Sequence, residues 1–156
     1  MKNKEYQLDA LYKKVLKLKS NGFSVGFTNG CFDLLHKGHL HIIKEAKLLC
    51  DFLIIGLNSD DSIKKLKGLD RPKDHLDIRL NKLKKLDDVD AIIVFKADTP
   101  KKLIDKLIPN VLVKGSEYKA GEVFGEKVIS NGGKIILVDL LPGISTSILI
   151  KKNNLK

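Results

Sequence analysis

Residues 28–39, Thr-Asn-Gly-Cys-Phe-Asp-Leu-Leu-His-Lys-Gly-His, join a short strand-like run to an amphipathic helix. Before them, the apolar residues at 23, 25 and 27 alternate with small residues, which is the period of a strand. After them, apolar residues recur every three positions from Leu40 to Leu49, which indicates a helix with one apolar face. A strand that turns through Gly30 into a helix N-terminus forms a site for an anion, because the free N–H groups and the helix dipole point beyond the end of the strand.

His36 and His39 lie three residues apart within this stretch. At that spacing, two side chains share one face of the first helical turn, so both can point into the same crevice. Gly38 lies between them and has no side chain, so nothing at this position would clash with a bulky ligand. The alternatives are a surface pair or part of a metal site, but zinc needs about four ligands and only Cys31 and His41 lie near.

The rest of the chain alternates strand patterns with helix patterns. Strands are expected at about 23–28, 52–57, 91–95, 111–113 and 134–138. Besides the helix that carries the histidines, helices are expected at about 5–19, 75–86, 100–107 and 121–130, with a last helix opened by residues 142–147 and reaching Lys152. Residues 61–74, broken by a glycine and a proline, are expected to form a short helix and then a mobile loop. This alternation predicts an α/β fold: a doubly wound, Rossmann-like parallel five-stranded sheet with helices on both faces. The 156 residues are one domain's length, with an N-terminal helix over 1–22 and a core over 23–152.

The formal charge is +10, and all but two of the 29 basic residues are lysine. A general lysine bias is the favoured explanation, with a polyanionic or phosphate-rich partner as the alternative. The lysines are scattered and are not interleaved with aromatic residues, which argues against a nucleic-acid groove. Arg71 and Arg79 lie close together in the sequence, and a planar guanidinium that matches phosphate is one reason to find arginine there.

Several classes of protein are disfavoured by composition. No apolar run approaches the length of a membrane span, and the charged N-terminus does not resemble a secretory signal. Cys31 and Cys50 are too few for a disulfide framework. We therefore expect a cytoplasmic protein that binds neither membrane nor nucleic acid.

The histidine-bearing stretch resembles a known motif. His36-Lys37-Gly38-His39, preceded by Asn-Gly-Cys-Phe-Asp, is similar to the H-x-G-H signature of the cytidylyltransferase-like nucleotidyltransferases. Members of that family transfer a nucleoside monophosphate from a triphosphate to a phosphorylated acceptor. The resemblance covers about residues 24–152, and it favours one subgroup, the D-glycero-β-D-manno-heptose 1-phosphate adenylyltransferases.

The resemblance to this subgroup rests on short segments spread along the chain. They are Asn58-Ser59-Asp60, Leu66-Lys67-Gly68, Arg71-Pro72, Val89-Asp90, Asp98-Thr99-Pro100, Val113-Lys114-Gly115 with Tyr118, and Gly143-Ile144-Ser145-Thr146-Ser147. The last of them also resembles the glycerol-3-phosphate cytidylyltransferases, so a CTP-dependent reaction on a polyol phosphate is the alternative. Asp98 and Thr99 are assigned to capping of the helix that follows, with Pro100 as its first residue.

The resemblance implies a reaction and a set of site residues. AMP would pass from ATP to heptose 1-phosphate, with Mg²⁺ carried on the ATP and no protein ligand of the metal identified. ATP and a sugar phosphate are then the expected partners, and a homodimer is compatible with the family. The implied catalytic residues are His36, His39, Lys67 and Arg71. Those implied for nucleotide binding are Thr28, Asn29, Gly30, Cys31, Phe32, Gly38, Lys114, Gly115, Tyr118, Ser145 and Thr146. Those implied for binding the acceptor are Asp33, Asn58, Asp60 and Arg79.

Overall fold

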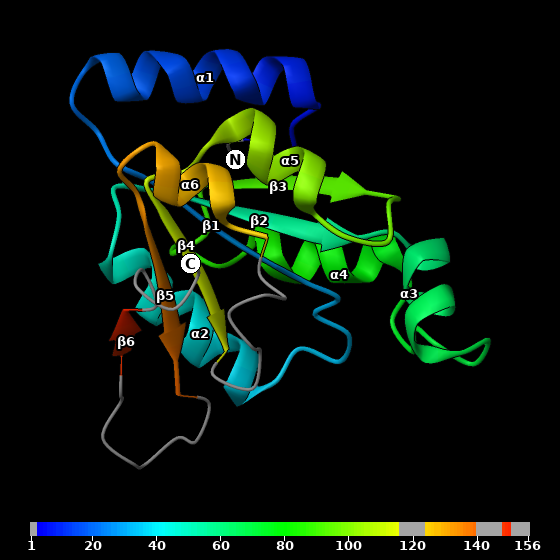
Figure 1. Ribbon diagram of the computed structural model, residues 1–156. Helices are drawn as coiled ribbons and strands as arrows, with labels where there is room; N and C mark the ends of the chain where they lie inside the picture. The colour runs from blue at the N-terminus through cyan, green and yellow to red at the C-terminus, as the bar shows by residue number, and fades with distance from the viewer. Residues whose placement is uncertain (1–2, 116–123, 140–147, 151–156) are drawn as a thin grey trace.

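The structure is a computed structural model that describes residues 3–115, 124–139 and 148–150 (Figure 1). The helices of this part of the chain are α1 (Leu8–Ser20), α2 (Lys37–Leu48), α3 (Asp60–Lys67), α4 (Leu76–Lys84), α5 (Lys101–Leu107) and α6 (Glu126–Ser130). The strands are β1 (Val25–Gly30), β2 (Phe52–Asn58), β3 (Ala91–Phe95), β4 (Val111–Gly115), β5 (Lys134–Val138) and β6 (Ile148–Ile150).

The strands form one sheet in the order β3-β2-β1-β4-β5-β6. Strands β1 to β5 are all parallel to their neighbours, which confirms the predicted five-stranded parallel sheet. The chain first builds outward from β1 to β2 and β3, and then continues on the other side of β1 with β4 and β5. The boundary between β1 and β4 is therefore the topological switch point, where ligands bind beyond the carboxyl ends of the strands.

The prediction that a C-terminal helix reaches Lys152 is wrong for residues 148–150. These residues form β6, which pairs antiparallel with β5 and places Val138 opposite Ile148. The run Ile-Leu-Ile is rich in β-branched side chains, which favour a strand when an open sheet edge is available to pair with. Residues 142–147, where the helix was expected to begin, lie outside the described part of the chain.

Several element boundaries also differ from the sequence analysis, among them the following three. The first helix begins at Leu8, because Glu5 forms a parallel bridge with Ile92 of β3. Strand β1 continues through Gly30, so this glycine ends the strand and does not form the turn. Helix α5 begins at Lys101, with Pro100 in the cap position. Each difference extends or moves an element by only a few residues.

Apolar side chains pack on both faces of the sheet. Along β2, Ile54 packs with the cluster beneath α1, α5 and α6, whereas Leu53 and Ile55 pack with the cluster beneath α2 and α4. Figure 1 shows α1 and α5 on one side of the sheet and α2 and α4 on the other. A strand covered by helices on both faces has to be apolar throughout, which is the pattern seen in β2.

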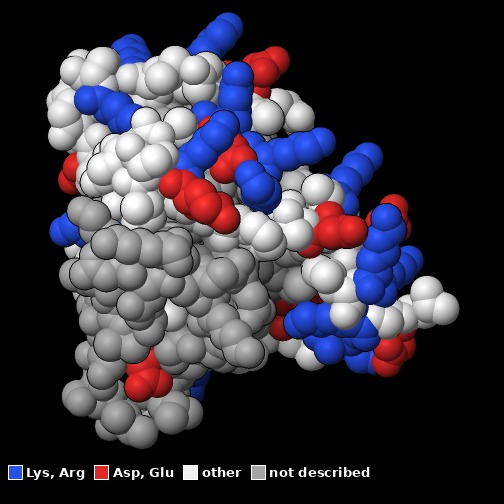
Figure 2. Space-filling model, viewed as in Figure 1, with Lys and Arg blue, Asp and Glu red and all other residues white. Residues whose placement is uncertain are grey.

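Charged side chains are dispersed over the outside of the molecule. On the face seen in Figure 2, lysine and arginine lie over α1, α5 and α3, with acidic side chains between them. Within the described residues, no helix is long and apolar enough to cross a bilayer.

Helix α1 is part of the packed structure, and a pair of leucine variants tests this. Leu11 is fully buried against the sheet, whereas Leu16 on the same helix is 49% exposed. Leu11→Ala should lower the free energy of unfolding by about 2–5 kcal/mol, because it leaves a cavity under the helix. Leu16→Ala, the control, should change it by about 0.5 kcal/mol or less. Urea denaturation measures both, and equal effects would contradict this packing.

Candidate active site at the carboxyl ends of the strands

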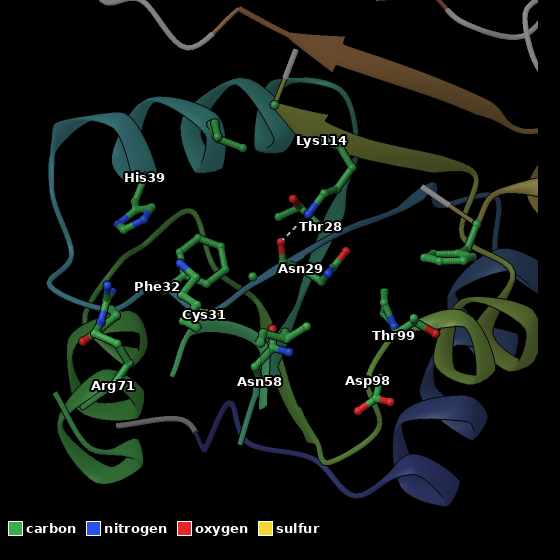
Figure 3. Close-up of a pocket in the computed structure, with 18 of the residues that line it drawn as sticks. Thr28, Asn29, Cys31, Phe32, His39, Asn58, Arg71, Asp98, Thr99 and Lys114 are labelled. Atoms are coloured by element: carbon green, nitrogen blue, oxygen red, sulfur yellow. Dashed lines mark hydrogen bonds and ion pairs between the residues drawn. The ribbon is translucent and has the colours of Figure 1, made fainter. Parts of the chain in front are cut away.

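The carboxyl ends of the central strands open into a cavity of about 670 Å³ (Figure 3). This volume lies within the range of roughly 300–1,000 Å³ that is usual for small-molecule sites. The walls come from the strand ends, the first turn of α2, the end of α3 with the loop after it, and the segment after β3. The residues that line it are Thr28, Asn29, Gly30, Cys31, Phe32, Asp33, His36, His39, Ile42, Asn58, Leu66, Lys67, Arg71, Asp98, Thr99, Pro100, Lys114, Gly115 and Phe124.

Two imidazoles cap the N-terminus of α2. The Nδ1 atom of His36 accepts a hydrogen bond from the amide of Gly38 at 3.0 Å, and the Nδ1 atom of His39 accepts one from the amide of His36 at 3.3 Å. The two rings are stacked with their centroids 3.8 Å apart. A neutral imidazole that accepts at Nδ1 carries its proton on Nε2. Both histidines therefore have Nε2–H as the donor that remains for a ligand in the cavity.

Gly38 serves the histidine pair more directly than it serves a ligand. A Cβ atom at this position would lie 2.9 Å from Cε1 of His36, so the glycine makes room for the ring to fold back over the helix end. Gly38 does not itself line the cavity. The expectation that Gly38 contacts the nucleotide stays a prediction.

The surroundings of His39 favour the neutral ring. Burial lowers the pKa of His39 to about 4, and its electrostatic interactions with His36 and Lys67 lower the pKa by more than the carboxylate of Asp33 raises it. The edge-to-face contact with Phe32, at a centroid distance of 5.3 Å, contributes to that burial. At neutral pH, His39 is therefore a fixed hydrogen-bond donor without a net charge.

The low pKa of His39 predicts a titration and a stability effect. The ring should protonate near pH 4 in the folded protein, whereas a histidine in the unfolded chain protonates near pH 6.5. Because the unfolded state takes up the proton first, the free energy of unfolding should fall as the pH is lowered from about 6.5 towards 4. An NMR titration of the ring protons measures the pKa directly. A midpoint near 6.5 would contradict the assignment.

Asp33 anchors the loop that forms one wall of the cavity. Its carboxylate is almost completely buried and accepts hydrogen bonds from the amides of Lys73 and Asp74 at 2.8 Å and from Nε of Arg71 at 2.9 Å. Burial alone would raise the pKa of Asp33, but these three donors outweigh it and lower the pKa to about 2. Asp33 lines the cavity as predicted, but both of its oxygens are already engaged by the protein. In this structure the carboxylate anchors the loop, and its contact with sugar hydroxyls stays a prediction.

The backbone on either side of Asp33 is strained. Phe32 and Leu34 have φ angles of 49° and 52°, in the left-handed region that non-glycine residues avoid at a cost of roughly 1–2 kcal/mol each. This conformation turns Asp33 inward while Leu34 is half exposed. The charge-assisted hydrogen bonds of Asp33 help to offset the strain.

Release of this anchor should expose the loop to protease. Asp33→Ala removes all three hydrogen bonds, so trypsin should cleave after Lys67 or Lys73 about tenfold faster or more under native conditions. Asp70→Ala is the matched control, because Asp70 lies in the same loop and its side chain is 78% exposed. Equal cleavage rates in the two variants would contradict the anchoring role.

Arg79 and Asp60 also hold the protein together and do not face the cavity. Arg79 is 1% exposed, and its guanidinium donates to Oδ1 of Asp60 at 2.6 Å. Its other hydrogen bonds go to the carbonyls of Cys31, Asn58 and Asp74. Their polar atoms join the ends of β1 and β2 to α3 and the loop before α4, and binding of the acceptor by Arg79 and Asp60 stays a prediction.

Three cationic side chains reach the cavity from two sides. Lys67 at the end of α3 and Arg71 in the following loop lie on one side. Lys114 comes from β4 and donates to the carbonyl of Asn29 at 2.7 Å. Cys31 lies between them, but burial raises the pKa of its thiol more strongly than these cations lower it, so it is not an activated nucleophile.

The structure brings together most of the predicted site. Of the residues expected to act there, Gly38, Asp60 and Arg79 do not line the cavity, and Tyr118, Ser145 and Thr146 lie outside the described residues. The lining residues that sequence analysis did not assign to binding are Ile42, Leu66, Asp98, Thr99, Pro100 and Phe124. For residues 98–100, the available signal was their position just after a predicted parallel strand, where ligands bind.

The parallel sheet defines a Rossmann-like α/β protein. The capped N-terminus of α2 and the cationic side chains lie beyond the switch point of this sheet, where they form an anion-binding site. The chain belongs to the cytidylyltransferase-like family, whose model matches residues 27–152.

Curated relatives are similar over most of this chain. The bifunctional protein HldE of Rhodopseudomonas palustris strain BisB5 is 45% identical over 140 residues, which are 89% of this chain and 29% of that protein. The bifunctional protein HldE of Nitrobacter hamburgensis is 42% identical over 145 residues, which are 92% of this chain and 30% of that protein. The chain therefore spans less than a third of the length of these relatives.

Solved structures share the fold. A lipopolysaccharide core biosynthesis protein from Thermoplasma volcanium has a TM-score of 0.62 and 26% identity, covering 77% of this chain and 98% of that one. A pantoate-β-alanine ligase from Francisella tularensis, with a TM-score of 0.57 and 18% identity, covers 84% of this chain and 66% of that one. The second likeness bears on the fold alone.

Proposed function

We propose that this protein is a nucleotidyltransferase that transfers AMP from ATP to D-glycero-β-D-manno-heptose 1-phosphate, giving ADP-heptose and pyrophosphate. The choice of substrates is supported by the 42–45% identity to bifunctional HldE proteins and by the segments that resemble heptose 1-phosphate adenylyltransferases. ATP is a cytoplasmic substrate, so we also propose a cytoplasmic location. The homodimer stays a prediction.

The reaction requires little covalent chemistry from the protein. A phosphate oxygen of the acceptor attacks the α-phosphorus of ATP, and the bond from that phosphorus to the oxygen bridging to the β-phosphate breaks. Pyrophosphate leaves with the bonding electrons. The nucleophile is already an anion, so no base is needed, and the barrier comes from negative charge on the reacting phosphates. Positioning and electrostatic stabilisation are then the main sources of catalysis.

The observation that carries the proposal is the pair of histidines at the N-terminus of α2. The backbone bonds at Nδ1 of His36 and His39 fix both rings and leave Nε2–H as the donor on each. Donors that are fixed before the reaction cost no reorganisation in the transition state. We assign them to oxygens of the transferred phosphate, assisted by the N–H groups and dipole of α2. Lys67 and Arg71 would hold the acceptor phosphate or the departing pyrophosphate.

Magnesium is the cofactor expected on the triphosphate. Within the described residues, no group of three or more His, Cys, Asp and Glu side chains could hold a metal ion. Mg²⁺ usually binds through substrate phosphates and one or two carboxylates, so the site suits an ion that arrives with ATP. When bound, the ion would neutralise charge on the phosphates.

The test is pyrophosphate release with ATP or CTP against heptose 1-phosphate of both anomers and glycerol 3-phosphate. We expect turnover only with ATP and the β-heptose phosphate. His39→Ala should lower that turnover by about 10²–10³, the usual loss for one preorganised donor to a developing oxyanion. His39→Gln should also be impaired, although glutamine at this helix position can still accept from the amide of His36.

His41→Ala is the matched control, because His41 is on the same helix and does not line the cavity. Urea denaturation of all three variants separates a loss of capping from a loss of catalysis. Near-normal turnover by His39→Ala would contradict the assigned role. Turnover with CTP and glycerol 3-phosphate would overturn the choice of substrates.

A further inference from the structure

The two ends of the cavity differ in charge. His39 and Arg71 lie at one side, and Asp98 and Thr99 lie at the opposite side (Figure 3). Cationic side chains and the N-terminus of a helix favour phosphate groups, so phosphate suits the side of Arg71 and α2. A carboxylate at the other side repels phosphate and accepts hydrogen bonds from neutral hydroxyl groups. The cavity therefore suits a ligand with a phosphate at one end and hydroxyls at the other.

We infer that Asp98 and Thr99 bind hydroxyl groups of the acceptor and select it, an inference that rests on the proposed function. Neither residue is assigned to binding by the sequence analysis, which uses both for helix capping. Asp98 is exposed, and among the described residues its carboxylate makes no hydrogen bond or ion pair with the protein. The other acidic residue that lines the cavity, Asp33, has both oxygens occupied.

Thr99 complements Asp98 with a donor. Its Oγ1 atom accepts from the amide of Lys101 at 3.4 Å, so its position is fixed by the start of α5. A hydroxyl that accepts a hydrogen bond can donate one at the same time, so Thr99 can still donate to a ligand. Together, the carboxylate of Asp98 and the hydroxyl of Thr99 supply an acceptor and a donor, which is the pattern that recognises neighbouring sugar hydroxyls.

The topology places these residues on the acceptor's side of the cavity. Nucleotides bind at the switch point between β1 and β4, where Gly115 ends β4. Asp98 and Thr99 follow β3, which is separated from β1 by β2. Lys67 and Arg71 follow β2, on the same side of β1 in the strand order, and Arg71 lies across the cavity from Asp98 (Figure 3). An acceptor held with its phosphate near Arg71 would extend its hydroxyls towards the end of β3.

The experiment compares the apparent KM for acceptor, ATP and Mg²⁺ in wild type and variants. Asp98→Asn should raise the KM for heptose 1-phosphate about tenfold or more, because it removes a charged hydrogen-bond acceptor and keeps the side-chain shape. The KM for ATP and the Mg²⁺ dependence should change less than about twofold. Thr99→Val should also raise the KM for heptose 1-phosphate. Asp87→Asn is the control, because it removes the same charge from an exposed residue that does not line the cavity.

A second readout tests hydroxyl recognition itself. Wild type should discriminate against deoxy analogues of the acceptor, and Asp98→Asn should lose most of that discrimination for at least one position. An unchanged acceptor KM, together with a raised ATP KM or a raised Mg²⁺ requirement, would overturn the inference and assign Asp98 to the metal or nucleotide.

The failure of this inference can be told from the failure of the proposed function. If wild type transfers a nucleotide to another phosphorylated polyol and not to heptose 1-phosphate, the proposed substrate is wrong, and the same comparison with that polyol decides the role of Asp98. If wild type uses no phosphorylated polyol, both are overturned.

Discussion

A buried guanidinium needs acceptors for its N–H groups, and at Arg79 that requirement holds the site together. The side chain bonds to the carbonyls that end β1 and β2, to the carbonyl of Asp74 and to the carboxylate of Asp60. These partners come from segments that are distant in sequence and meet only in the folded chain. Because desolvating an unpaired charge is costly, the burial of Arg79 favours the one arrangement in which all of them converge. The cavity above the strands depends on that convergence.

The histidine pair shows how one interaction serves both structure and chemistry. The first turn of any helix has N–H groups without partners. Here two of the nearby amides donate to imidazole nitrogens, and these bonds orient the rings and set their tautomers. The same burial that completes the cap keeps His39 neutral at physiological pH. In the proposed reaction, the helix end and the rings act as one anion-binding surface.

The walls of the cavity are held with unequal strength. On one side, Asp33 fixes the loop after α3 by three hydrogen bonds, against the strain of Phe32 and Leu34. On the opposite side, Asp98 makes no such bonds among the described residues and is exposed. A carboxylate that is fully used by the protein maintains structure, whereas one that faces the cavity without partners is available to a ligand. This difference separates the roles of two residues of the same type.

The sequence by itself determined the parallel sheet, the helices beside it and the histidine-bearing N-terminus of α2, because these depend on local periodicity and on motif spacing. It also identified most of the cavity wall, since residues that follow parallel strands meet at one edge of the sheet. It could not distinguish an arginine that lines the cavity from one that is buried among protein acceptors, because Arg71 and Arg79 are alike until burial and partners are known. It could not show that Asp33 is engaged by the protein while Asp98 faces the cavity, and the strand β6 was missed because it depends on an open sheet edge. Only tertiary structure decides these points, since the availability of a polar side chain depends on contacts with residues far away in the chain.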